Sequence, residues 1–82
     1  MSIFSKRYRA LARQIMLARK HSGMTQKELA RRLDKPQSYV SKIESGERRL
    51  DFVELVESAE ALGLPPLDLI HTVLSDPSFR DI

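Results

Sequence analysis

Hydrophobic positions recur along this chain at intervals of three and four residues, with polar and charged positions between them, which is the period of amphipathic helices. The first such run predicts a helix over residues 5–22 that ends at Gly23. Its apolar positions are Tyr8, Leu11, Ile15 and Ala18. The rest of the chain follows the same period without repeats or an internal linker. We expect an all-α fold, a compact five-helix bundle, in a single domain over residues 1–82.

A second helix begins at Thr25, where two start signals coincide. In the run Thr25-Gln26-Lys27-Glu28 the threonine oxygen can accept from the backbone N–H of Glu28, while the Glu28 side chain reaches back to the N–H of Thr25. Met24 and Leu29 occupy the two positions of a hydrophobic staple. The apolar stripe of this helix is Leu29, Ala30 and Leu33.

A third helix follows after a tight turn at residues 34–36. Proline pushes the preceding residue out of the α region but is itself tolerated at the first helical position, so we expect the helix to begin at Pro36. Its apolar side is Tyr39, Val40 and Ile43, and its polar side is Gln37, Ser38, Ser41, Lys42 and Ser45. Small hydroxyls, an amide and an ammonium suit the major groove of DNA. An ordinary solvated face is the other interpretation, and the well-capped helix before a short turn favours DNA.

Residues 10–72 resemble the helix-turn-helix family of the phage repressors and Cro, also called the xenobiotic response element (XRE) family. The helix-turn-helix itself covers residues 25–45. The matching positions are Arg19, Gly23-Met24-Thr25-Gln26, Leu29-Ala30, Val40, Ile43 and Glu44-Ser45-Gly46. Two positions depart from the family pattern, since many relatives have glycine in place of Asp34 and a serine or threonine cap in place of Pro36. Aspartate tolerates the left-handed conformation, so the turn is kept, but the register of the third helix is open by about one residue.

The resemblance implies roles for individual residues. In that family the residue matching Gln26 contacts a phosphate and supports the recognition helix, and those matching Arg19 and Glu44 form a largely buried salt bridge. Residues matching Gln37, Ser38 and Lys42 face base edges. We therefore expect base reading from Gln37, Ser38, Ser41 and Lys42. Phosphate contacts are expected from Gln26, Lys27, Tyr39, Ser45, Arg48 and Arg49.

Charge is distributed very unevenly along the chain. Residues 1–49 hold 13 Lys and Arg against 4 Asp and Glu, a net charge of +9, whereas residues 50–82 hold 1 against 7, a net charge of −6. The basic half carries the predicted helix-turn-helix, as phosphate binding requires. An acidic protein partner or solubility alone would also account for a basic half.

Two further helices are expected in the acidic half. Asp51 and Glu54 predict a capped start, and the buried stripe is Phe52, Leu55, Val56, Ala59 and Leu62, ending at Gly63. A final helix opens at Pro65-Pro66 and carries Leu67, Leu69, Ile70, Val73 and Leu74. Five large apolar residues are more than one buried stripe of so short a helix needs. We therefore expect these five to form a homodimer interface in a dimerisation region at about 64–75. In the resembling repressors this region helps form the dimer contact. The tail 78–82 carries no clear signal and is expected to fray.

Several classes of protein are disfavoured. The chain has no cysteine, and its two histidines lie in different predicted helices, so we expect no metal site, no cofactor and no enzyme. No apolar run approaches a signal peptide or a membrane span, so we expect no membrane association and a cytoplasmic location.

The predicted function is a sequence-specific transcriptional regulator that binds double-stranded DNA with a two-fold symmetric operator. A repressor is favoured over an activator, because so short a chain has little surface to spare for polymerase. The alternative is the antitoxin of a toxin–antitoxin pair, which would bind a toxin protein partner as well as its own promoter. A restriction-modification controller also remains open.

Overall fold

The computed structural model describes residues 5–80 and folds them into six helices without a strand. They are α1 (Lys6–His21), α2 (Gln26–Arg32), α3 (Gln37–Glu44), α4 (Phe52–Ala61), α5 (Pro66–Ser75) and α6 (Pro77–Arg80). The all-α prediction is confirmed. The first five helices lie where the sequence predicts them to within about one residue at their starts, and α6 is an addition to the five expected.

Helix ends are set by local signals that the sequence carries. Ser5 caps α1, its hydroxyl accepting from the backbone N–H of Tyr8 at 3.3 Å. At the other end Gly23 adopts φ +75°, and the N–H of Met24 donates to the carbonyl of Arg19 at 3.1 Å. Both features belong to the left-handed helix ending in which glycine avoids the strain of a Cβ.

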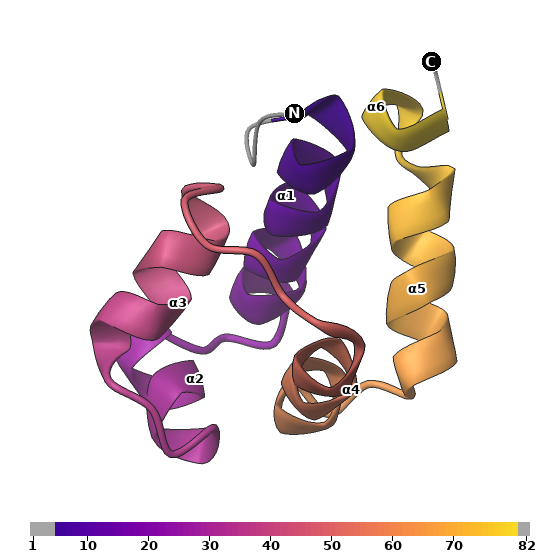
Figure 1. Ribbon diagram of the computed structural model, residues 1–82. Helices are drawn as coiled ribbons and strands as arrows, with labels where there is room; N and C mark the ends of the chain where they lie inside the picture. Colours follow the sequence, from indigo (N-terminus) through magenta and orange to yellow (C-terminus); the bar gives the residue numbers. More distant parts are fainter. Residues whose placement is uncertain (1–4, 81–82) are drawn as a thin grey trace.

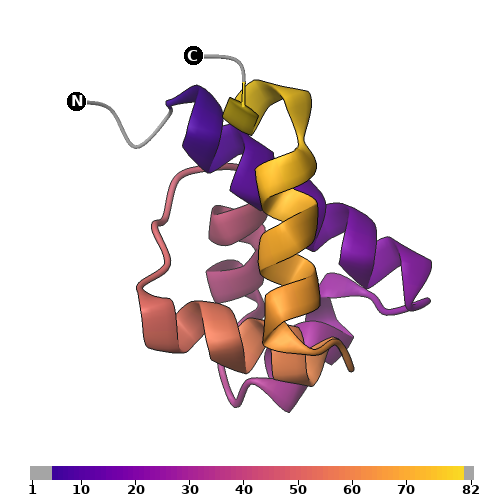
Figure 2. The same cartoon turned by 90° about the vertical axis from the view of Figure 1, so that its right-hand side faces the viewer.

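The helices pack around α1. In Figure 1, α2 and α3 lie on one side of α1 and α5 lies on the other, while α4 is seen nearly end-on between them. Figure 2 confirms the separation, because α5 is nearest the viewer and α3 lies behind it. The most deeply buried large side chains come from α1, α2, α3 and α5, and these are Ile15, Leu29, Val40 and Leu69. The core thus fixes α2 and α3 on α1 from one side and α5 from the other.

Helix α4 begins with the predicted capping box. The Asp51 carboxylate accepts from the N–H of Glu54 at 2.8 Å, and the Glu54 carboxylate accepts from the N–H of Asp51 at 3.0 Å. The predicted buried stripe is partly wrong, since Ala59 and Leu62 are buried but Phe52 is 70% exposed. Phe52 is the first residue of the helix, whereas Ala59 and Leu62 lie at its other end and belong to the hydrophobic core.

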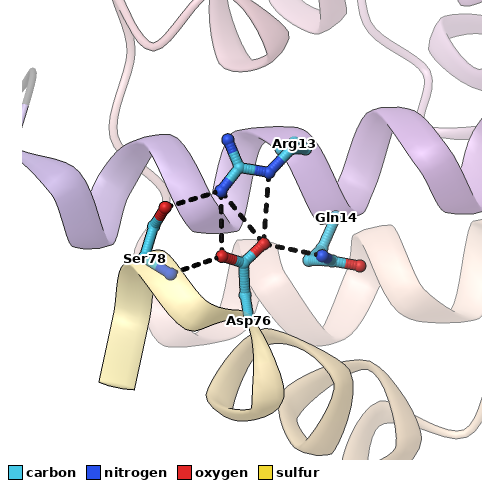
Figure 3. Close-up of polar contacts among 4 residues, drawn as sticks. All are labelled: Arg13, Gln14, Asp76 and Ser78. Carbon is cyan, nitrogen blue, oxygen red and sulfur yellow. Dashed lines mark hydrogen bonds and ion pairs between the residues drawn. The ribbon is translucent and has the colours of Figure 1, made fainter. Parts of the chain in front are cut away.

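The expectation of a frayed tail is wrong as far as Arg80, because the C-terminal segment is fastened to α1. Asp76, only 4% exposed, accepts three hydrogen bonds from Arg13, at 3.2 and 3.1 Å to its Oδ2 and at 2.9 Å to its Oδ1. Gln14 donates to the same carboxylate at 2.8 Å, and so does the N–H of Ser78, which makes Asp76 the cap of α6 (Figure 3). Arg13 holds the pKa of Asp76 down at about 2. Residues 81–82, also part of that tail, lie outside the described residues.

Among residues 5–80, no helix is both long and apolar enough to cross a membrane.

Candidate nucleic-acid interface

The start of α2 carries the predicted threonine cap. Thr25 Oγ1 accepts from the N–H of Glu28 at 3.0 Å, but the reciprocal half of the capping box is not formed. The Glu28 carboxylate instead accepts from Arg31 and Arg32, one helical turn along. These hydrogen bonds, that from Arg31 first, lower the pKa of Glu28. One carboxylate thus partly neutralises two of the cations on this helix.

The turn between α2 and α3 uses Asp34 where glycine is usual in this position. Asp34 has φ +57°. The N–H of Lys35 donates to the carbonyl of Ala30 at 2.9 Å, and the N–H of Asp34 donates to the carbonyl of Arg31 at 3.1 Å. This is a Schellman ending with aspartate in the left-handed position, a conformation that aspartate tolerates better than most residues. The predicted short turn is therefore formed in spite of the missing glycine.

Helix α3 starts one residue later than predicted. Pro36 is its cap, with extended backbone and no side-chain hydrogen bond, and Gln37 is the first helical residue. The predicted division of faces is confirmed: Tyr39, Val40 and Ile43 are buried. The opposite face is carried by Gln37, Ser38 and Lys42, which are exposed, and by Ser41, which is half-buried. All four predicted base-reading residues therefore lie together on the outer face of α3.

The hydroxyls of this face are turned along the helix. Ser41 Oγ donates to the carbonyl of Ser38 at 3.2 Å, and Ser45 Oγ lies 3.1 Å from the carbonyl of Lys42 and 2.8 Å from the Glu47 carboxylate. A serine that donates its hydrogen to its own helix keeps oxygen lone pairs free. The Ser41 hydroxyl can therefore accept a hydrogen bond from a donor on a ligand that faces α3.

A buried ion pair holds α3 to α1, as the resemblance implied. Arg19 donates to the two carboxylate oxygens of Glu44 at 2.6 and 2.9 Å, and their side chains are 9% and 5% exposed. Arg19 also donates to the carbonyl of Met24, between α1 and α2, at 2.8 Å. Gln26 donates to Glu44 at 3.1 Å. Arg19 thereby holds both the end of α3, through Glu44, and the segment just before α2, through the carbonyl of Met24.

The six residues predicted to contact phosphate have different surroundings. Lys27 and Arg49 are exposed, although Arg49 lies over the ring of Tyr8 at 5.0 Å. Ser45 is also exposed, and Gln26 is half-buried. Tyr39 is only 9% exposed and belongs to the hydrophobic core, so burial raises the pKa of its hydroxyl.

Arg48, the remaining predicted phosphate contact, is held by α4. It donates to both carboxylate oxygens of Glu54 at 3.1 and 2.9 Å, and its guanidinium lies 4.6 Å from the centre of the Tyr39 ring. The ion pair raises the pKa of Arg48 and lowers that of Glu54. The sequence offered no signal for this pair, because Glu54 was already accounted for as a helix cap.

The predicted dimer residues separate into two groups. Leu69 and Val73 are 1% and 7% exposed, so the expectation that they meet a second copy is wrong: both are part of the protomer's own core. Leu67 and Leu74 are exposed and Ile70 is half-buried. Ile70 and Leu74 line an apolar groove of about 700 Å³, whose lining also includes Tyr8, Leu11, Leu55 and Phe79.

The geometry is that of a helix-turn-helix protein: two short helices joined by a tight turn, with the second helix exposing a polar face. A helix-turn-helix family model matches residues 15–69, about two thirds of the chain. The chain belongs to the XRE family of helix-turn-helix proteins.

Solved structures of similar proteins support this assignment. An XRE-family-like protein from Pseudomonas syringae pv. tomato is 46% identical, with 82% of each chain covered and a TM-score of 0.76. The restriction-modification controller protein C.AhdI from Aeromonas hydrophila is 27% identical over 76% of this chain and 94% of its own, with a TM-score of 0.71. The clp gene regulator ClgR from C. glutamicum is 25% identical over 82% of this chain and 87% of its own, with a TM-score of 0.76. A comparison with curated proteins finds no match.

Proposed function

We propose that this protein is a transcriptional regulator that binds double-stranded DNA sequence-specifically, with α3 in the major groove. Family membership and the similarity to a restriction-modification controller and a gene regulator support the DNA-binding regulator. The observation that carries the finer proposal is the outer face of α3. It presents Gln37, Ser38 and Lys42 to solvent, while Glu44, the carboxylate of this helix, is turned inward against Arg19.

Charge supports the same face. The basic half of the sequence supplies α1, α2 and α3, whereas the acidic half supplies α4 and α5. A DNA backbone lying against α2 and α3 would meet Lys27 and Arg49 at the surface, and Lys42 points out from α3 itself. Such cations release counterions from DNA and supply affinity that does not depend on sequence.

We further propose that the protein binds DNA as a homodimer, with the apolar groove and Leu74 at the interface. One recognition helix reads only a few base pairs, so repressors of this kind gain specificity from two half-sites about 34 Å apart. Phe52, 70% exposed, precedes the groove-lining Leu55 by one helical turn and extends the apolar surface. The groove is formed largely by α1 and α5, and α5 lies on the opposite side of α1 from α3, so a partner there would leave α3 free (Figure 1).

The proposed regulatory outcome is repression, because a protein that occupies promoter DNA competes with polymerase without needing any further contact. The relatives described above are named as family members or regulators, and none as an antitoxin. The toxin partner considered from the sequence therefore has no support here and is not part of the proposal.

Selection of binding sites from random DNA tests the function directly, since the proposal requires a consensus sequence. Gln37→Ala should then weaken binding to that consensus by about 1–3 kcal/mol and leave binding to random DNA nearly unchanged. Thr72→Ala, an exposed position on α5, is the control and should change neither. Equal losses on consensus and random DNA for Gln37→Ala would remove the base-reading role of α3.

A further inference from the structure

A row of polar side chains connects the buried ion pair to the exposed tip of α3. Glu44 accepts from Arg19 at 2.6 and 2.9 Å and from the amide nitrogen of Gln26 at 3.1 Å. The amide oxygen of Gln26 in turn lies 3.5 Å from the amide nitrogen of Gln37. Exposure increases along the row: Glu44 is buried at its side chain, Gln26 is half-buried, and Gln37 is exposed.

The Glu44 carboxylate, at the buried end of the row, fixes the direction of the hydrogen bonds from Glu44 through Gln26 to Gln37. An ionised carboxylate has acceptors only, whereas an amide has a donor end and an acceptor end. Gln26 must therefore turn its NH₂ group toward Glu44, and this leaves its oxygen on the side of Gln37. Gln37 can meet that oxygen only with its own NH₂ group. The carbonyl oxygen of Gln37 and the second hydrogen of its NH₂ group are then left for a ligand.

We propose that Glu44 is a positioning residue for base recognition, because it sets the amide orientation of Gln26 and, through Gln26, that of Gln37. The inference rests on the proposed function, in which Gln37 faces the major groove. A glutamine that presents its oxygen to the groove selects a base with an exocyclic amino group, which is adenine or cytosine. Adenine also offers the N7 acceptor to the second hydrogen of the Gln37 NH₂ group.

Without this constraint the same glutamine would discriminate poorly. The two ends of an amide have nearly the same shape, and a half-turn exchanges donor and acceptor. A free Gln37 could therefore offer oxygen to adenine or its NH₂ group to the two acceptors of guanine. Glu44 removes one of these orientations before DNA arrives.

The experiment begins with binding-site selection for the unaltered protein and for Gln37→Ala. The base pair whose preference disappears in Gln37→Ala is the one that Gln37 reads. The inference requires adenine or cytosine to be favoured there over guanine by about tenfold or more. Relative affinities for the four bases at that one position are then measured for variants of the row.

Glu44→Gln is the first variant, because it replaces an acceptor-only group with one that can also donate to Gln26. Gln26→Ala is the second, because it interrupts the row and leaves the ion pair of Arg19 and Glu44 in place. Both should reduce the preference at this position to about twofold or less, whatever happens to overall affinity. Combining either with Gln37→Ala should cause no further change there, since coupled residues do not act additively.

Asp76→Asn is the control for general destabilisation, since it weakens the clamp on α1 without touching α2 or α3. It should leave the base preference unchanged. If Glu44→Gln does not fold, Gln26→Ala decides alone.

Besides the lack of that preference over guanine in the unaltered protein, three results would overturn the inference, and they point to different errors. If both variants of the row weaken all sequences alike and keep the base preference, Glu44 has a structural role only. A consensus in which Gln37→Ala changes no position would remove Gln37 as the reader while leaving DNA binding intact. An unaltered protein that selects no consensus would contradict the proposed function and the inference together.

Discussion

Arg19 donates to both carboxylate oxygens of Glu44, and their side chains are only 9% and 5% exposed, so α3 is fastened to α1 by a desolvated ion pair. Desolvation makes such a pair costly to form, but much more costly to break from one side. The hydrogen bonds that Arg19 donates to Glu44 are the main cause of the raised pKa of Arg19. The pair links the position of α3, the helix proposed to read DNA, to the stability of the whole domain.

Glu44→Ala should therefore lower the free energy of unfolding by about 3–5 kcal/mol, because it leaves the charge of Arg19 buried without a partner. Replacing both residues, Arg19→Met with Glu44→Leu, should cost less than the sum of the two single changes. Chemical denaturation monitored by circular dichroism measures all three. Glu60→Ala removes an exposed glutamate from α4 and should stay within about 0.5 kcal/mol of the unaltered protein. A Glu44→Ala variant as stable as this control would show that the pair contributes nothing.

The clamp between Arg13 and Asp76 predicts a specific sensitivity to acid. The folded protein holds the pKa of Asp76 at about 2, below its ordinary value of 3.8. Because the folded pKa is the lower one, the clamp stabilises the protein fully above about pH 4, and the contribution is lost as the pH falls through about 2. Asp76→Asn should lower stability at pH 7, and the difference from the unaltered protein should shrink steadily below pH 4. Denaturation at several pH values measures it, and a difference that is constant from pH 7 to pH 2 would contradict the assignment.

Much of the fold is predictable because it is encoded by local signals. Thr25 and Asp51 cap their helices as expected, and Asp34 adopts the left-handed conformation that its place between two helices requires. Even α6 had a local signal that was missed. Asp76 followed by Pro77 is a cap followed by the favoured residue at the first helical position, which is a helix start of the ordinary kind.

The sequence does not determine which of two neighbouring apolar faces of one helix is buried. On α5, Leu69 and Val73 form one apolar stripe and Ile70 and Leu74 form another, about 100° further round. Both stripes have the same spacing, so the periodicity cannot tell which is buried. The packing of α5 against α1 and α4 buries Leu69 and Val73 and leaves Leu74 at the groove. The pairing of Arg48 with Glu54 is likewise not predictable from the sequence, because it depends on the conformation of the loop after α3.

Glu54 neutralises the charge of Arg48 through their ion pair, so weakening that pair should strengthen binding to DNA of any sequence. Glu54→Gln keeps a residue that can complete the capping box but removes the charge that holds Arg48. We expect tighter non-specific binding and a steeper dependence on salt, by up to about one unit in the slope. Glu57→Gln is the matched control, since it removes the same charge one turn further along α4, from an exposed position.

Binding to random DNA at several salt concentrations separates the two variants. Arg48→Ala should bind more weakly than the unaltered protein, and adding Glu54→Gln to it should bring no gain. Equal strengthening by Glu54→Gln and Glu57→Gln would mean that only net charge matters and that Arg48 does not reach the backbone.

The last prediction concerns the proposed dimer and uses two leucines of nearly equal exposure. Leu74, 49% exposed, lines the apolar groove, whereas Leu17, 47% exposed, lies in a separate hollow whose lining includes His21, Leu64 and Thr72. Leu74→Asp should give a folded monomer, because a charge at a two-fold interface faces its own copy or a partner's apolar surface. Leu17→Asp should remain a dimer. Val73→Asp, by contrast, puts a charge in the core and should unfold the protein.

Sedimentation measures the mass of each variant, and circular dichroism checks that its helices are kept. Leu74→Asp should also lose the cooperative binding to two half-sites while still binding random DNA, because α3 lies on the other side of α1 from α5 (Figure 1). A protein that sediments as a monomer at high micromolar concentration, both alone and with its consensus DNA, would contradict the dimer. Reading of two half-sites would then require another partner, and the groove beside Leu74 would be the surface on which to search for it.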